Sequence, residues 1–491
     1  MKRWPKYVTC FAVVCFTFSV SAQSPFSLDT TFRTEIGNNY VGSVLPLDDG
    51  SLIASGVMQF PGETFLKRLV KLDSDGSRDE SFYNSGLGGG TIIPYDDRFY
   101  VGANTTVRRI LMNGTQDSSF IGMNLGPYFS SFQGGDYHVF PDGRVVMSGS
   151  HMLSDSIRGF VGIHNFIWFT NTGYLDTTRT HRQANGAIYR FKELPDGKFI
   201  CSGVMNEFEG EPVGRIFRVH ADGSLDASFQ TNAYWGEASA YHALDDGRVL
   251  AGGRFLINGI TDTLRLTRFL PDGTVDPTFN SPSFGLGTLP DASGWGSLVS
   301  NIYPMGQGYY ILQGNFREVN GQPRLGICLI SENGDLVEDF FNEHGGGPTE
   351  YLGYTFANQQ GIAPTPDGEY FYVWGRYHGY SDGTVNDSLQ RFISRLHAGD
   401  LALADEHSPS HAERFSIYPN PAHNELQIQI GSEWNNTRYA IFDGSGRVVK
   451  ESKIQSAEST LMIPIGALAA GSYLVELRSE EKVFRQQFIK R

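Results

Sequence analysis

The chain has few cysteines for its length. Four occur in 491 residues, and two of them, Cys10 and Cys15, lie in an apolar N-terminal segment. The other two, Cys201 and Cys328, stand in the apolar stretches Phe-Ile-Cys-Ser-Gly and Gly-Ile-Cys-Leu-Ile, which indicate strand interiors. Two cysteines cannot form a disulfide framework for a chain of this size. We therefore expect both to be free, buried, small apolar residues.

Basic residues are also scarce. Lys and Arg number 39 against 53 Asp and Glu, which gives a formal net charge of −14. Nucleic acids and anionic membranes bind basic surfaces, so this balance argues against both as partners. Beyond the N-terminal segment no run of 18 apolar residues occurs, so we expect no transmembrane span in the mature chain.

Common catalytic motifs are missing too. The sequence contains no Gly-x-Ser-x-Gly, no phosphate-binding loop and no His-Glu-x-x-His, and we expect no cofactor. The segment Asp73-x-Asp75-Gly76-x-x-Asp79 superficially suggests calcium. A calcium loop of the EF-hand kind needs more oxygen ligands and a bidentate glutamate at its twelfth position, which this segment lacks. We expect such aspartates to cap turns through their side chains instead.

The N-terminus has the three parts of a secretory signal peptide. Lys2, Arg3 and Lys6 precede an apolar run over residues 8–20, and Val-Ser-Ala22 stands before Gln23. This pattern predicts a signal peptide over residues 1–22 that is cleaved after Ala22. An uncleaved anchor is the alternative, but the run is shorter than the roughly 20 residues that span a bilayer.

Glycine, by contrast, is abundant, and much of it belongs to a repeat of two elements. The first element is an Asp-Gly pair between apolar stretches, followed by a second glycine, as from Asp49-Gly50 to Gly56. In the second element, an Asp/Asn-Gly pair is followed by an aspartate three residues after the glycine and a phenylalanine six residues after it. Its clearest copies are Gly76, Asp79 and Phe82; Gly223, Asp226 and Phe229; and Gly273, Asp276 and Phe279.

This repeat predicts a closed ring of β-sheets. Asp-Gly between apolar runs is typical of tight hairpins, so each unit contains about four strands. Seven copies of each element, with a period of about 53 residues, predict a seven-bladed β-propeller over residues 23–403. A solenoid is the alternative, but it needs terminal capping repeats that the sequence does not show.

The chain ends indicate how the ring closes. The mature N-terminus contains Leu28-Asp29-Thr-Thr-Phe32, which matches the tail of the second element without its Asp-Gly pair. The seventh unit ends near Gly399 without that tail. We therefore expect residues 28–32 to pair with residues 391–396 and complete the last blade, which protects the edges of the ring.

The repeated pattern Arg-Leu-x-x-Asp-Gly-x-x-Asp-x-x-Phe resembles the delta-60 repeats of bacterial secreted propeller proteins. The resemblance covers about residues 26–403. It implies a fold and no particular biochemical activity.

The C-terminal segment differs from the repeats. A polar linker over residues 404–414 precedes about seven short apolar runs in residues 415–491, which predict a small β-sandwich. The order of its motifs resembles the type A sorting domain of type IX secretion. That resemblance implies a bacterium of the Bacteroidota type, passage from the periplasm across the outer membrane through the type IX machinery, and removal of the module. The residues that carry it are Tyr418, Pro419, Asn420, Pro421, Gly446, Gly471 and Tyr473.

The ligand is not evident from the sequence. Irregular, aromatic-rich and Gly-rich insertions over residues 134–138, 234–241, 281–295 and 343–354 are the candidate contacts, because long loops carry function more often than scaffolds do. We expect a secreted or cell-surface protein that binds an extracellular glycan or protein without catalysis. Two alternatives stay open: a glycan hydrolase or lyase with its site in the propeller channel, and a purely structural surface protein.

Overall fold

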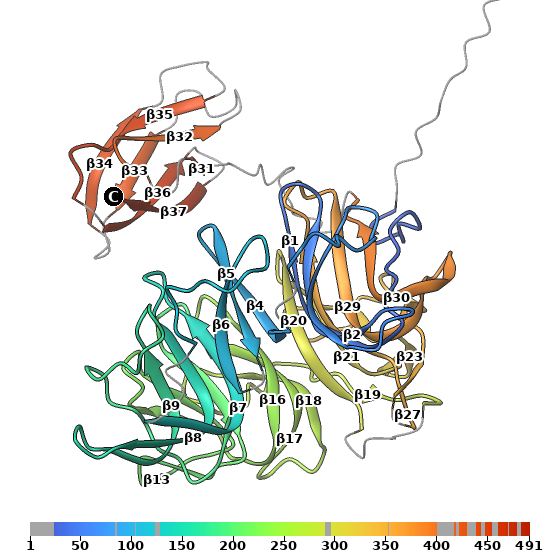
Figure 1. The fold of residues 1–491 in the computed structure, drawn as a ribbon, viewed down its shortest axis with the longest axis horizontal. Coiled ribbons are helices and arrows are strands. Elements are labelled where there is room, and N and C mark those ends of the chain that lie inside the picture. The colour runs from blue at the N-terminus through green and yellow to red at the C-terminus, as the bar shows by residue number, and fades with distance from the viewer. Residues whose placement is uncertain are drawn as a thin grey trace, which may run out of the picture. The chain divides into compact units, whose positions relative to one another are not determined.

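The structure, a computed structural model, contains strands and turns and divides into two compact units, residues 1–401 and 402–491 (Figure 1). No helix in the described part of the chain is long and apolar enough to cross a membrane. The described residues are 24–83, 86–103, 105–122, 128–289, 296–351, 353–399, 417–418, 422–429, 438–442, 447–453, 460–469, 471–478 and 483–491.

The described part of the first unit contains seven principal antiparallel sheets, numbered here in chain order. They are sheet 1, β1 (Asn38–Pro46), β2 (Leu52–Gln59) and β3 (Lys67–Leu72); sheet 2, β4 (Gly89–Tyr95), β5 (Arg98–Ala103) and β6 (Thr106–Leu111); sheet 3, β7 (Phe129–Val139), β8 (Val145–Asp155) and β9 (Phe160–Phe169); sheet 4, β10 (Ile188–Glu193), β11 (Phe199–Gly203), β14 (Ile216–Val219) and β15 (Leu225–Gln230); sheet 5, β16 (Ala233–Ala243), β17 (Val249–Ile257) and β18 (Leu264–Phe269); sheet 6, β20 (Leu298–Gly306), β21 (Tyr309–Asn315) and β24 (Ile327–Ser331); and sheet 7, β28 (Asn358–Pro364), β29 (Tyr370–Asp382) and β30 (Asn386–His397), with β25 (His344–Gly346) added to β29.

The first unit also contains shorter strands. They form the hairpin β12 (Glu207–Phe208) and β13 (Glu211–Pro212); the small sheet β19 (Phe284–Gly285), β22 (Glu318–Val319) and β23 (Gln322–Pro323); and the hairpin β26 (Thr349–Tyr351) and β27 (Tyr354–Phe356).

The sheets follow one another in a ring. Each sheet contacts the next, and β1 of sheet 1 contacts β28 and β29 of sheet 7. The first strands of most neighbouring sheets also contact one another, so they surround the centre of the ring. Apolar side chains fill the junctions: Leu250 and Leu266 of sheet 5, for example, pack with Val299 and Leu312 of sheet 6. Complete burial of such a side chain stabilises the fold by about 1.5–3 kcal/mol. The predicted β-propeller fold is confirmed.

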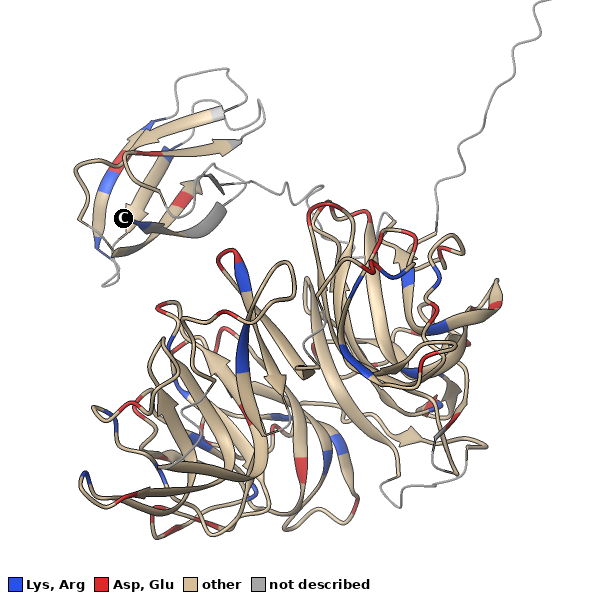
Figure 2. Ribbon diagram, in the orientation of Figure 1, with Lys and Arg blue, Asp and Glu red and all other residues tan. Residues whose placement is uncertain are grey.

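The acidic residues of this unit lie mostly in the turns between strands (Figure 2). In the Asp-Gly hairpins that join first and second strands, the aspartate closes its own turn. Asp49 accepts a hydrogen bond from the backbone N–H of Ser51 at 3.0 Å, and Asp246 accepts one from that of Arg248 at 3.0 Å. The charge therefore serves local turn geometry, as is common for aspartate in such positions.

The ring closes by pairing its two chain ends, as predicted. Phe26 N donates to His397 O at 2.8 Å, Asp29 N donates to Arg395 O at 2.9 Å, and Leu28 forms an antiparallel bridge with Leu396. The N-terminal segment thus adds a short strand to β30, and sheet 7 has no open edge at this point.

The same segment supplies the missing half of the seventh repeat. Arg395 Nε donates to Asp29 Oδ2 at 2.7 Å, and its guanidinium carbon lies 5.2 Å from the centroid of the Phe32 ring. Asp29 Oδ1 meanwhile accepts the backbone N–H of Thr31 at 2.9 Å. Equivalent Arg–Asp–Phe stacks occur within the repeats at Arg109, Asp117 and Phe120; at Arg218, Asp226 and Phe229; and at Arg268, Asp276 and Phe279.

Both cysteines of the described chain are buried and free, as expected. Cys201 lies in β11 and Cys328 in β24, with sheet 5 between their two sheets. Burial raises the pKa of the Cys328 thiol to about 12, so it remains protonated at neutral pH.

The second unit is a small β-sandwich, which confirms that part of the predicted fold. Its core combines Leu426 and Ile463 from one sheet with Ile441, Val475 and Phe488 from the other. The predicted signal peptide, the linker over residues 404–414, and Pro419, Asn420, Pro421 and Gly446 lie outside the described residues. The sheets are β31 (Ile417–Tyr418), β32 (Glu425–Gln429) and β35 (Thr460–Pro464), and β34 (Val448–Lys453), β33 (Arg438–Phe442), β36 (Gly471–Arg478) and β37 (Val483–Lys490).

The ring-closing ion pair gives a testable prediction. Asp29→Asn keeps the turn acceptor but removes the charge that faces Arg395, so we expect the free energy of unfolding to fall by about 2 kcal/mol. Urea unfolding followed by circular dichroism measures this. Asp272→Asn is the matched control, because Asp272 caps the same kind of turn through Thr274 but is exposed. Equal effects of the two substitutions would contradict a stabilising role of the Arg395 pair.

Candidate functional site

The repeat glycines predicted from the sequence occupy positions that other residues would not tolerate. Gly76, Gly223 and Gly273 have φ angles of +92°, +81° and +90°. A Cβ atom at Gly76 would lie 2.4 Å from Arg33 O, and one at Gly273 would lie 2.6 Å from Gln230 N. These glycines let the second-element turn pack against the preceding repeat's tail, so they are structural.

The repeat aspartates and phenylalanines are structural as well. Asp226 and Asp276 each accept a bond of 2.7 Å from an arginine Nε, and Asp79 lies 3.9 Å from Lys71 Nζ. The Oδ1 atom of each of the three accepts the backbone N–H two residues later. Phe82, Phe229 and Phe279 are buried. Within the described residues, no group of three His, Cys, Asp or Glu side chains could hold a metal ion.

Three residues of the sorting motif can be placed in the second unit. Tyr473 stacks on Phe488 with 5.7 Å between ring centroids, and its hydroxyl donates to Ala469 O at 2.9 Å. Gly471 begins β36, and Tyr418 ends β31. The contacts of Tyr473 lie within the sandwich.

Two of the four predicted insertions are not loops. Residues 134–138 lie in β7, and residues 234–241 lie in β16, so the expectation of surface loops is wrong there. Both stretches belong to first strands with register shifts, and the extra residues of these bulges produced the irregular sequence pattern. Residues 343–354 contain β25 and β26, and residues 281–289 contain β19, while residues 290–295 lie outside the described chain.

The first strands of sheets 3, 4 and 5 carry several charged residues. Burial raises the pKa of Asp136 and of Glu237, and Arg190 lowers both. Lys192 Nζ donates to Tyr241 O at 3.2 Å. The nearby positive charge of Arg190 thus partly offsets the cost of burying these two carboxyl groups.

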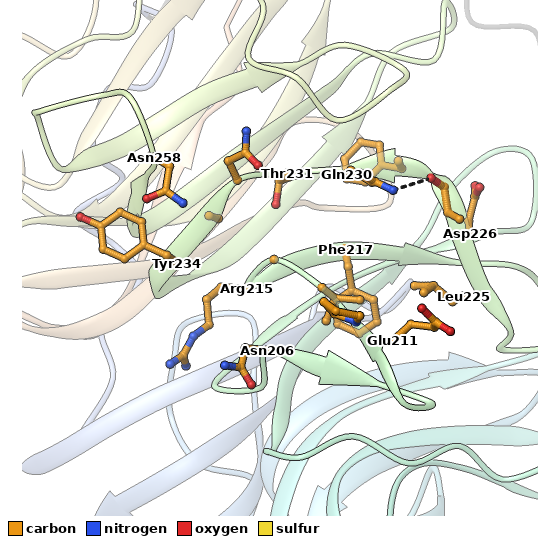
Figure 3. A pocket seen from close by; sticks show the side chains of 17 residues that line it. Asn206, Glu211, Arg215, Phe217, Leu225, Asp226, Gln230, Thr231, Tyr234 and Asn258 are labelled. Atoms are coloured by element: carbon orange, nitrogen blue, oxygen red, sulfur yellow. Dashed lines mark hydrogen bonds between the residues drawn. The ribbon is translucent and has the colours of Figure 1, made fainter.

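A cavity with a volume of about 510 Å³ lies beside β15 (Figure 3). Its walls come from the β12–β13 hairpin, from β14 and β15, and from the first residues of β16. The turn after β17 adds Asn258, whose backbone N–H donates to Asn232 O at 3.0 Å. Figure 3 shows Arg215 and Asn206 near Tyr234 and Asn258, whereas Glu211 and Leu225 lie farther along the pocket.

The pocket lies where the link between sheets 4 and 5 is short. Residues 220–232 connect the third strand β14 to β16, whereas residues 270–297 connect the third strand β18 to β20, and only residues 231–232 remain between β15 and β16. A link of two residues spans roughly 7 Å at most, so the second element of this repeat must itself cross the sheet. It does so as β15, which pairs with β14 through Phe217–Gln230 and Val219–Leu225. A register shift lies between these pairs, and residues of both strands line the pocket.

The polar groups of the pocket are suited to a hydroxyl-rich ligand. Arg215 Nη1 makes one long hydrogen bond of 3.4 Å to Gly203 O. In sheet 5 the equivalent Arg265 donates to Ser297 Oγ at 3.1 Å, in the link to the next sheet. Tyr234 is 50% exposed beside these donors. Guanidinium, amide and hydroxyl groups around an exposed aromatic ring provide hydrogen bonds and an apolar platform together.

Two family models match parts of the chain. Residues 416–491 match the secretion system C-terminal sorting domain, and residues 194–229 and 244–279 match a β-propeller domain of unknown function, DUF5122. The protein is a type IX-sorted β-propeller. The sorting domain indicates secretion or a cell-surface location.

Solved structures similar to this propeller have low sequence identity. The extracellular domain of the hybrid two-component system BT4673 of B. thetaiotaomicron is 11% identical, with 95% of this chain and 58% of that chain covered and a TM-score of 0.37. The WD40 domain of Neurospora crassa Pan2 is 8% identical, with coverages of 76% and 98% and a TM-score of 0.32. AztD of Citrobacter koseri is 11% identical, with coverages of 86% and 97% and a TM-score of 0.27. No curated protein matches the chain in sequence.

Sequence reasoning missed most of the pocket of this type IX-sorted propeller. Of its lining, only Tyr234 fell within a predicted insertion. Asn206, Arg215 and Asn258 come from three different turns and strand ends, which only the fold brings together. One signal was present in the sequence: the short distance from Phe229 to the next apolar stretch makes this repeat different from the others.

The ion-paired aspartates predict a loss of stability in acid. Burial raises the pKa of Asp276, but hydrogen bonds from Thr278 and Arg268 outweigh it and hold the pKa at about 2. Because this lies below the unfolded value of about 3.9, its contribution is complete above pH 4 and is lost as the pH falls toward 2. The free energy of unfolding should therefore fall between pH 6 and pH 2. We expect this fall to be smaller in Asp276→Asn, by up to about 2 kcal/mol. Urea unfolding at several pH values measures this, and an unchanged pH slope would contradict it.

Proposed function

We propose that this protein is a non-catalytic glycan-binding protein that acts outside the cell. The observation that carries the proposal is the pocket beside β15, where the half-exposed Tyr234 ring adjoins Asn206, Arg215 and Asn258. Sugar rings offer hydroxyl groups to amides and guanidinium groups and C–H faces to aromatic rings. A cavity of about 510 Å³ falls in the range of small-molecule sites, so it could hold one or two sugar units.

The export route supports an extracellular ligand. We propose that residues 1–22 are a signal peptide, that the type IX machinery recognises the C-terminal sandwich, and that this module is removed during export. The propeller, with its N-terminal strand paired to β30, is then the mature binding unit, and we propose that its seven sheets are its blades. Ring closure pairs both chain ends of that unit in sheet 7, which leaves no open strand edge there.

A glycan-active enzyme is the second candidate. It is favoured by the charged side chains on the first strands of sheets 3 to 5, where Asp136 and Glu237 both have raised pKa values and share Arg190 as a nearby cation. A carboxyl group with a raised pKa can act as a general acid in glycoside cleavage. A structural surface protein would show neither binding nor turnover.

A glycan screen tests the binding proposal. We expect the exported protein to bind a polysaccharide on an array without releasing product, and we expect Tyr234→Ala to lower the affinity about tenfold, because a lost aromatic contact costs about 1.4 kcal/mol. Calorimetric titration measures the affinity. Tyr174→Ala is the matched control, since Tyr174 is 52% exposed in a turn of sheet 3. Product release would favour the enzyme, and the absence of any bound glycan would contradict the proposal.

Deletion of residues 415–491 tests the export route. We expect the truncated protein to disappear from the medium and the cell surface and to accumulate in the periplasm, because the sorting signal is lost. Immunoblots of the three fractions measure this. A fusion of residues 415–491 to an unrelated periplasmic protein is the control and should be exported. Undiminished export of the truncated protein would contradict the role of the C-terminal domain.

A further inference from the structure

Trp235, the residue after Tyr234, lies outside the pocket but is strongly exposed. Its exposed fraction is 41%, which is unusual for a tryptophan in a strand. The first residues of β16 contain a register shift between Ala233 and Trp235, so Tyr234 is the extra residue of a bulge. Such bulges redirect side chains at strand ends. Tyr234 and Trp235 can therefore serve different surfaces although their Cα atoms are only about 3.8 Å apart.

The two aromatic side chains belong to opposite faces of sheet 5. Ala233 packs in the apolar cluster that contains Ile216 of sheet 4, and Tyr234 lines the pocket on that side. Trp235 is in register with Leu256 of β17, on the face that Leu250 presents to sheet 6. Alternation along β17 places Arg254 on the same face as Leu256. Trp235 thus lies on the face of β16 that is turned toward sheet 6, whereas the pocket lies on the face that is turned toward sheet 4.

Arg254 supports one face of the indole ring. Its guanidinium carbon lies 5.1 Å from the centroid of Trp235. Such cation–aromatic stacking fixes the orientation of a ring that would otherwise be free to rotate. The Trp235 ring thus forms an aromatic platform at the start of β16, with Arg254 against one of its faces.

The same stack occurs in sheet 7, where a second aromatic ring also lies against the arginine. Arg376 follows the repeat glycine of β29 as Arg254 follows that of β17, and Phe356 precedes β28 at the position of Trp235. Arg376 lies 4.5 Å from the Phe356 ring and 5.1 Å from that of Tyr40, which belongs to the next sheet. In sheet 6 the residue equivalent to Tyr40 is Leu298.

The two stacks differ in the second ring and in the size and exposure of the first. In sheet 7 the arginine lies between two aromatic rings, one of them from the neighbouring sheet. In sheet 5 an aliphatic residue replaces the second ring, and the larger Trp235 stays exposed on the surface. A guanidinium group behind the indole disfavours a cationic ligand in front of it, whereas the C–H face of a neutral sugar is compatible with it.

We propose that Trp235 is a second sugar-stacking subsite, so that the ligand is a polysaccharide chain that crosses the start of β16 from the pocket to the indole. The proposal rests on the glycan-binding function proposed above and deepens it. A chain of several units contacts Tyr234 and Trp235 together, whereas a single sugar contacts only the pocket. Affinity therefore depends on chain length, and Trp235 carries that dependence.

A size series tests this inference. The probes are oligosaccharides of one to six units, cut from the polysaccharide with the strongest array signal and titrated into the full-length exported protein. We expect the affinity to rise about tenfold from one unit to six. Trp235→Ala should reduce that rise to less than threefold and leave the affinity for one unit unchanged, whereas Tyr234→Ala should weaken binding at every length. Tyr174→Ala should match the unsubstituted protein.

A second variant distinguishes loss of the subsite from misfolding. Trp235→Phe keeps an aromatic ring over Arg254, so we expect it to retain most of the length dependence but to lose the change in tryptophan fluorescence that hexasaccharide binding causes. If every length binds equally, or if Trp235→Ala keeps the full rise, the second subsite is wrong while glycan binding stands. If no probe binds, the proposed function fails and this inference fails with it.

Discussion

An arginine held between an aspartate and a phenylalanine ring is the interaction on which the propeller depends. It joins the third strand of a sheet to the turn that leads to the next one, at Arg109, Arg218 and Arg268 and, across the chain ends, at Arg395. Each stack ties a hydrogen-bonded ion pair to a buried ring, so charge pairing and apolar burial reinforce each other. The stack at Arg395 closes the ring, because its arginine lies in the last strand of sheet 7 whereas its aspartate and phenylalanine lie in the N-terminal segment.

Sheet 4 contains this stack, but its link to the next sheet differs from that of sheet 5. In sheet 4 the stack forms as usual around Asp226, yet only two residues remain to reach the next sheet. The second element therefore becomes β15, and the cavity with Arg215 opens beside it. The proposed site thus lies where the spacing between two sheets differs from that of the other repeats, while the surrounding propeller keeps the repeat pattern.

Much of this architecture could be predicted from the sequence, for physical reasons. Glycine positions with positive φ, such as Gly273, and alternating apolar runs are local signals, and the truncated repeat at Leu28 gave the ring closure. The candidate site could not be predicted in the same way, because Asn206 and Asn258 meet only through sheet packing. Bulges in β7 and β16 also resembled loops, since an extra residue disturbs the alternation on which strand assignment relies.

In the proposed complex a glycan occupies the surface around the start of β16. Hydrogen–deuterium exchange of the exported protein, with and without the best-binding polysaccharide, measures this occupancy. We expect slower exchange in residues 206–215 and 230–236, with little change in the first strands of sheets 3 and 4. Protection confined to those strands, around Asp136 and Arg190, would contradict it and would place the ligand in the centre of the ring.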